Sequence, residues 1–165
     1  MNSIGLEQHL IDFPTIHEIW RNKLWPGRTS SIETHSAMTW PYASKDPYDM
    51  AIFENTASFF GVFAEGTLVG VNSGHKTSDT YYRSRGLWVD PNFRKQGIAQ
   101  MLFQMTEQQA IDERCFFMWS IPRKTALTAY QRFGFSTVGG FFNTETSDSN
   151  IYVIKHLPQD SLVTI

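Results

Sequence analysis

The segment Arg85–Met105 constrains the fold most, because it places a strand-like run, a turn and a helix-like run in direct succession. The apolar run Leu87–Val89 is typical of a strand, and Asp90-Pro91-Asn92 breaks it. The residues that follow predict a helix, because one face of it is apolar at i, i+3, i+4 and i+7. That face carries Ile98, Met101, Leu102 and Met105.

The start of this predicted helix has the properties of an anion site. The first backbone amides of a helix have no partner within the helix and carry partial positive charge. Gly97 and the small Ala99 leave room for a phosphate to approach the backbone, and Arg94 and Lys95 add positive charge. The segment is neither a Walker loop nor the three-glycine dinucleotide motif. An ordinary strand–loop–helix with an incidental glycine fits the spacing equally well.

The remaining patterns predict a mixed sheet. Ala57–Ala64 and Thr67–His75 read as a hairpin, and strands are expected at residues 80–90, 114–121, 135–142 and 150–157. A second helix carries Ala126, Ala129, Tyr130 and Phe133 on one stripe and ends at Gly134. Before the hairpin we expect a helix in residues 12–24, a short helix capped by Ser31, and a loop at residues 41–50. A weak strand is also expected in residues 3–11. The fold class is α/β (α+β), with helices on both faces of the sheet.

Length and composition favour one globular domain. The chain has 165 residues, of which 41% are hydrophobic and 18% charged. A net charge of −2 without a Lys/Arg run does not favour nucleic acid as a partner. Cys115 lies in a predicted buried strand, so we expect a core residue and a reducing compartment. Without a signal peptide, a membrane span or metal-ligand spacing around the histidines, a cytoplasmic, metal-free protein is expected.

Two segments together resemble the GNAT superfamily of N-acetyltransferases. "LWVDPNFRKQGIAQML" is similar to its acetyl-CoA-binding segment, with Arg94, Gly97 and Ala99 in the motif positions, and "TALTAYQRFGF" is similar to its Ala-x-x-x-Tyr helix. The resemblance covers residues 58–157 and implies a GNAT-like sheet of about six to seven strands. It implies a single domain over residues 1–165, with the acetyl-CoA-binding core at 58–157 and a helical acceptor-site part at 1–57.

The resemblance also implies a mechanism. Acetyl-CoA is the co-substrate, no metal is used, and a primary amine attacks the thioester directly through a tetrahedral intermediate. The strands around Leu87–Val89 and Met118–Trp119 are expected to separate at a β-bulge and admit the pantetheine arm. A backbone amide near Val89 stabilises the oxyanion, and Tyr130 protonates the leaving thiolate. The implied cofactor-binding residues are Leu87, Trp88, Val89, Arg94, Lys95, Gln96, Gly97, Ile98, Ala99 and Gln100.

The sequence departs from the family at two positions. Where many relatives carry a glutamate base, this chain has Arg83 and Met118, and Arg123 replaces a cofactor-contacting asparagine. His75, Asp79, Tyr82 or a water chain are the candidates for the base. Arg123 is expected to contact a phosphate or to have no role in the cofactor site.

The acceptor is not specified by the sequence. Trp25, Trp40, Tyr42 and Tyr48 can form an acceptor clamp, but packing of a lid or a homodimer contact explains each of them better. The amine-bearing acceptor can be a small molecule, a peptide or a modified nucleotide. Two other functions remain open: a catalytically weak acyl-CoA-binding module, and a nucleic-acid-modifying relative that uses the local Arg83-Ser84-Arg85 sequence.

Overall fold

One mixed sheet forms the centre of the molecule. The computed structural model describes residues 5–144 and 149–158. The sheet has seven strands in the order β1-β2-β3-β4-β5-β7-β6, with β4 and β5 parallel and the other neighbours antiparallel. The strands are β1 (Leu6–Leu10), β2 (Ala57–Ala64), β3 (Thr67–Lys76), β4 (Tyr81–Val89), β5 (Phe117–Ser120), β6 (Ser136–Phe142) and β7 (Asn150–His156). The expected mixed sheet, including its weak first strand, is confirmed.

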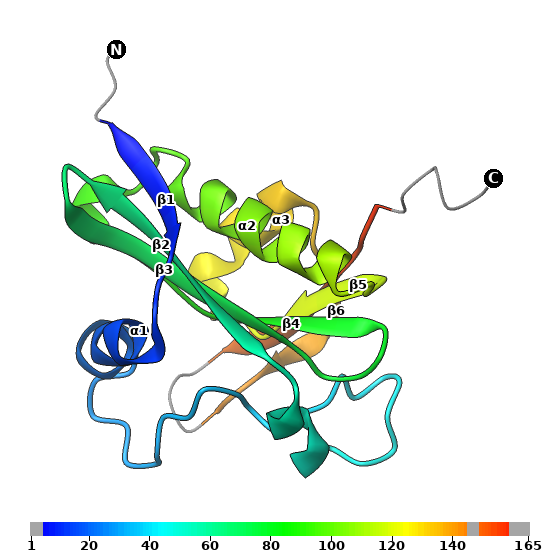
Figure 1. Cartoon of the computed structure of the whole chain (residues 1–165). Helices are drawn as coiled ribbons and strands as arrows, with labels where there is room; N and C mark the ends of the chain where they lie inside the picture. The colour runs from blue at the N-terminus through cyan, green and yellow to red at the C-terminus, as the bar shows by residue number, and fades with distance from the viewer. Residues whose placement is uncertain (1–4, 145–148, 159–165) are drawn as a thin grey trace.

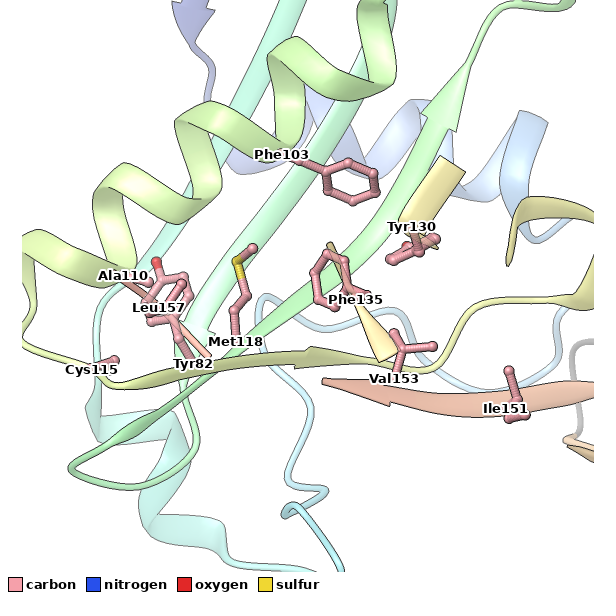
Figure 2. Packing of buried hydrophobic residues seen from close by; sticks show 10 residues of the cluster. All are labelled: Tyr82, Phe103, Ala110, Cys115, Met118, Tyr130, Phe135, Ile151, Val153 and Leu157. Carbon is pink, nitrogen blue, oxygen red and sulfur yellow. The ribbon is translucent and has the colours of Figure 1, made fainter. Parts of the chain in front are cut away.

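Helices cover both faces of the sheet (Figure 1). Helices α2 (Ile98–Asp112) and α3 (Leu127–Phe133) lie on one face, and α1 (Phe13–Ile19) lies with the N-terminal loop on the other. Beneath α2 and α3, Phe103, Tyr130 and Phe135 pack with strand residues in one core cluster (Figure 2). On the opposite face, Ile16 and Trp20 pack against Val71 of β3. The N-terminal part therefore supplies both an edge strand and a cover for the sheet.

Glycines mark the ends of the two motif helices. Gly97 is the N-cap of α2 with φ of 81°, and Gly134 is the C-cap of α3 with φ of 108°. Both values lie in the left-handed region, which glycine adopts without the steric cost that other residues incur. The positions expected from the sequence for both helix ends are confirmed.

In the N-terminal third, the helix expected at residues 12–24 is present as α1 and a following π-helical turn at Trp20–Leu24, whereas two other features differ from the prediction. The short helix capped by Ser31 is wrong, because residues 31–40 contain no helix. Hydroxyl groups bond the backbone there instead: Met38 donates its amide to the Ser36 hydroxyl, and the Thr39 hydroxyl donates to the Asp46 carbonyl. A 3₁₀ turn at Met50–Glu54 was not expected.

Candidate active site

The site begins where β4 and β5 separate. Their pairing runs from Tyr81 with Phe117 to Arg83 with Trp119, and in the described chain no later residue of β4 pairs with β5. The Ser84 carbonyl still accepts a hydrogen bond from the Ser120 hydroxyl, and the remainder of β4, residues 85–89, has no strand partner on this side. An unpaired edge of this kind can receive an extended ligand as an additional strand.

A β-bulge accompanies the separation. On the other side of β4, Val71 pairs with Trp88 and Ser73 pairs with Arg85, so two residues of β4 lie opposite one residue of β3. Gly86 within the bulge has φ of 80°, and its carbonyl accepts a hydrogen bond from the Trp20 indole at 2.8 Å. A Cβ atom on Gly86 would lie 2.3 Å from Trp20, so the bulge requires glycine here. The expected splayed strands with a bulge are present.

A groove of about 1130 Å³ occupies the gap between the strands. Its walls include Leu87–Val89, the residues around the start of α2, and Tyr130 of α3. Among the described residues expected to bind acetyl-CoA, Gln96 alone does not line the groove. The two sequence motifs therefore meet at one cavity, although they lie on different helices.

The start of α2 is open to the groove. Gly97 has no side-chain cap, and a Cβ atom built on it would meet no described atom within 4 Å. Lys95 also has a positive φ, of 63°, so the backbone turns sharply just before the helix. Successive amides in such a turn form a concave donor surface that suits a phosphate oxygen. The local geometry thus fits the diphosphate of coenzyme A.

Tyr130 combines core packing with access to the groove. Its side chain is 3% exposed, and its ring centroid lies 4.7 Å from that of Phe103 and 5.3 Å from that of Phe135 (Figure 2). Burial raises the pKa of Tyr130 to about 12, against the opposing effects of the Ser120 hydroxyl and of Arg83. The phenol is therefore protonated at neutral pH, as a proton donor must be.

The three side chains considered as the base lie outside the groove. His75 is 0% exposed; its Nδ1 donates to the Lys76 carbonyl, and its Nε2 accepts from the Ser36 amide. Burial also lowers the pKa of His75 well below 6.5. The Tyr82 hydroxyl is directed to Glu113, and Asp79 is exposed in the turn between β3 and β4. None of these three side chains is therefore placed to take a proton from an amine in the groove.

Two buried arginines lie on β4, and one of them, Arg83, occupies one of the two positions, with Met118, at which the resemblance implied a glutamate base. Arg83 is 9% exposed and Arg85 is 5% exposed, and both line the groove. Burial lowers the pKa of Arg83 to about 10 and that of Arg85 to about 9, so both remain charged at neutral pH. Because both are buried, the Arg83-Ser84-Arg85 sequence does not form an exposed basic patch for nucleic acid. From the sequence, Arg83 was expected only as a departure from the family or as part of a basic Arg83-Ser84-Arg85 sequence; the signal for a buried site residue was the pair of arginines inside a predicted strand.

The N-terminal segment, residues 23–48, forms one wall of the groove. Arg123 donates from Nη2 to the Leu24 carbonyl at 2.6 Å, so it joins the loop after β5 to this segment. Trp40 is buried against Trp119 and Tyr152, with ring centroids 5.5 Å and 5.7 Å away. Packing is therefore the confirmed role of Trp40. Exposed Tyr48 and half-buried Trp25 line the groove.

Other chemistries find little support in the described residues. They contain no cluster of His, Cys, Asp or Glu able to hold a metal ion. None of their helices is long and apolar enough to cross a membrane. Cys115 lies in the core, as expected, and burial raises the pKa of its thiol to about 11, which disfavours a nucleophilic thiolate.

Several solved structures share this fold. Ard1 from Thermoplasma volcanium superimposes with a TM-score of 0.67 at 16% identity, over 93% of this chain and 99% of that one. The ribosomal-protein-S18-alanine N-acetyltransferase from Escherichia coli gives 0.63 at 12% identity, over 95% and 97%. A streptothricin acetyltransferase from Bacillus anthracis, solved with acetyl coenzyme A, gives 0.56 at 17% identity. That match covers 62% of this chain and 63% of the enzyme, so it extends over less than two thirds of the enzyme's length.

The family follows from the sequence match. No curated protein matches the chain. The model of the acetyltransferase (GNAT) family matches residues 19–135, which include the separated strands and both motif helices. The chain therefore belongs to the GNAT family of acetyltransferases, and the protein is an acyltransferase.

Proposed function

We propose that this enzyme transfers an acetyl group from acetyl-CoA to a primary amine by direct attack through a tetrahedral intermediate. One observation carries the proposal: the unpaired edge of β4, the start of α2 and Tyr130 all line one groove at the point where β4 and β5 separate. We assign residues 58–157 to acetyl-CoA binding and residues 1–57 to closing the acceptor side, within one domain over residues 1–165.

The groove offers a partner for each part of acetyl-CoA. The pantetheine amides would pair with backbone groups of Leu87–Val89, as an added strand does. The diphosphate would accept hydrogen bonds from amides of residues 95–100, assisted by the charge of Arg94. The thioester oxygen would then lie near the amide of Val89. One preorganised donor of this kind typically lowers a barrier by about 3 kcal/mol.

Tyr130 is the proposed proton donor to the leaving thiolate. The bond between sulfur and the acetyl carbon breaks as the tetrahedral intermediate collapses, and the sulfur then takes the phenol proton. A raised pKa makes the phenol a weaker acid. The same burial raises the pKa of a thiol, so the two shifts offset each other when the proton passes from the phenol to sulfur, and the phenolate then regains a proton from water.

The attacking amine must be neutral. The guanidinium groups of Arg83 and Arg85 line the same groove, and positive charge nearby disfavours an ammonium ion. The site thus promotes loss of the amine proton to water without a fixed base. This replaces the catalytic carboxylate by an electrostatic effect of two buried cations.

The relatives support an amine as the acceptor, since one of the structural neighbours is an alanine N-acetyltransferase by name. The test is an amine screen with acetyl-CoA, followed by thiol release and by the mass of the product. Thiol release coupled to an acetylated amine is expected. Saturable acetyl-CoA binding without transfer to any amine would instead support an acyl-CoA-binding module.

A further inference from the structure

Among the described residues, eight cationic side chains line the groove: Lys23, Arg28, Arg83, Arg85, Arg94, Lys95, Arg123 and Arg132. Arg94 and Lys95 lie beside the proposed diphosphate site, whereas Arg28, Arg83 and Arg85 line the wall toward the N-terminal segment. Among the described residues of the lining, Asp90 is the only carboxylate, and it caps the 3₁₀ turn that precedes Arg94. The three arginines thus face no other carboxylate of the described lining, whereas the Glu33 carboxylate, outside the lining, acts on Arg85 and partly offsets the fall in its pKa. Acetyl-CoA phosphates would not neutralise them if the diphosphate binds at α2.

Arg83 lacks the partners that a buried arginine normally has. Its Nε and Nη1 atoms are buried and make no hydrogen bond within the described structure. The guanidinium instead stacks on Trp119, with its carbon 5.1 Å from the ring centroid. A buried donor without an acceptor is costly, and one that persists indicates an acceptor supplied from outside the chain.

Arg83 is also close to the reaction centre. It lies in the sequence stretch where β4 leaves β5, and the charge of Arg83 acts on the ionisation of Tyr130. An anion held by Arg83 would therefore sit near the sulfur and the acetyl carbon. The anion and the attacking nitrogen would then belong to one small molecule.

Arg85 and Arg28 are held in place beside Arg83. Arg85 donates from Nη1 to the Glu33 carbonyl at 3.0 Å, and its guanidinium carbon lies 4.9 Å from the Trp20 ring and 5.4 Å from the Trp25 ring. Arg28 donates hydrogen bonds to the Ser30 hydroxyl and the Ser31 carbonyl, and its guanidinium carbon lies 4.9 Å from the centroid of the Trp25 ring. Stacking and hydrogen bonds fix two cations before any ligand binds, which reduces the entropic cost of binding an anion.

We infer that the acceptor is a small amine that also carries an anionic oxygen group, a carboxylate or a phosphate, held by Arg83 with Arg28 and Arg85 nearby. This inference rests on the proposed function and specifies its acceptor. An arginine fork matches the paired oxygens of either group. Amino acids and phosphorylated amines are the two sources of this chemistry, and they can be tested separately.

The experiment compares matched pairs of amines that differ in this charge. Each of several L-amino acids is tested against its amide, and O-phosphoethanolamine against ethanolamine, with acetyl-CoA and full-length enzyme. Wild type, Arg83→Gln and Arg21→Gln are compared; Arg21 is an exposed arginine outside the groove lining. Melting temperature with each amine, in the presence and absence of coenzyme A, gives a readout that does not need turnover.

We expect at least one anionic amine to have a kcat/KM about 10-fold or more above its neutral partner. Arg83→Gln should abolish this preference, and Arg21→Gln should keep it. If only the amino acids are preferred over their neutral partners, the anionic group of the acceptor is a carboxylate. If only O-phosphoethanolamine is preferred, the group is a phosphate.

Two results overturn the inference while acetyl transfer itself stands: equal rates for charged and neutral partners, or a preference that survives Arg83→Gln. If no amine is acetylated, an anion-dependent rise in melting temperature that Arg83→Gln removes still supports the inference. The absence of any such rise overturns it. If the wild-type enzyme does not bind acetyl-CoA, the proposed function itself is overturned, which is a different result from those above.

Discussion

Arg83 pairs with Trp119 at the last position where β4 and β5 are joined, and its guanidinium stacks on the indole ring of that partner. Beyond this pair the strands separate and the groove begins. The residue is thus placed by strand pairing and by stacking, whereas its Nε and Nη1 have no hydrogen-bond partner in the described chain. A residue needed mainly for stability would have these donors satisfied.

This arrangement predicts that Arg83→Met does not destabilise the unliganded protein. Each unsatisfied buried donor costs about 1–3 kcal/mol, and methionine removes that cost while filling similar space. The loss of stacking on Trp119 opposes this gain by about 0.5–2 kcal/mol. Thermal unfolding should therefore show an unchanged or raised melting temperature.

The matched variant is Arg85→Met, because the Arg85 guanidinium is hydrogen-bonded to Glu33 and stacked on two tryptophans. It should lower the free energy of unfolding by about 1–3 kcal/mol. Equal destabilisation by both substitutions would contradict a ligand-binding role for the unpartnered donors of Arg83.

Tyr130→Phe should reduce kcat by about 100-fold and leave the Kd for coenzyme A unchanged. The ring keeps its contacts with Phe103 and Phe135, so the fold is retained, while the proton donor is lost. Steady-state kinetics and a binding titration measure the two effects. Tyr81→Phe is the control, since Tyr81 stacks on Phe117 outside the groove lining. A Tyr130→Phe enzyme with wild-type kcat would remove this residue from the mechanism.

Gly97→Ala should weaken coenzyme A binding by about 10-fold or more. Alanine at φ of 81° costs about 1 kcal/mol of stability, and its methyl group lies where a phosphate would approach the backbone. Gly66→Ala provides the control: φ there is 83°, a Cβ would also meet nothing described within 4 Å, and the residue lies in the turn between β2 and β3. The two variants should lose similar stability. Similar affinities for coenzyme A would show that the phosphate does not approach Gly97.

The burial of His75 predicts a pH dependence of stability. Its folded pKa is well below 6.5, so the unfolded chain binds one more proton as the pH falls below that value. The free energy of unfolding should therefore fall with decreasing pH, by up to about 1.4 kcal/mol per unit for this proton. Chemical denaturation at pH 5 to 7 would measure the slope. His75→Gln should flatten it and exposed His156→Gln should not; an unchanged slope in His75→Gln would assign the proton elsewhere.

Local patterns were sufficient for the core of the fold. The β2–β3 hairpin, the helix that starts after Gly97 and the one that ends at Gly134 each follow from short-range periodicity and glycine placement. The N-terminal loop was harder, because residues 31–40 are held by hydroxyl-to-backbone bonds and by contacts to distant strands. The bonds of Arg85 to the Glu33 carbonyl and of the Ser36 amide to His75 are examples, and they join residues far apart in sequence.

The roles of His75 and Arg83 could not be predicted from local sequence either, because they depend on tertiary structure. The sequence suggested His75 because histidine titrates near neutral pH, but the folded structure encloses its ring between the Ser36 and Lys76 backbones. From the sequence, Arg83 was interpreted only as a position at which the glutamate base of many relatives is missing. Only the strand register places that residue at the separation of β4 and β5, where its charge faces the groove.

Hydrogen exchange of the backbone amides, with and without saturating coenzyme A, measures whether the cofactor lies between β4 and β5. Exchange should slow in two segments at once, the strand residues Leu87–Val89 and the helix start at residues 95–100, while β1 should exchange at the same rate in both states. Unchanged exchange in both segments at saturation, or protection confined to other parts of the chain, would contradict a cofactor held between β4 and β5.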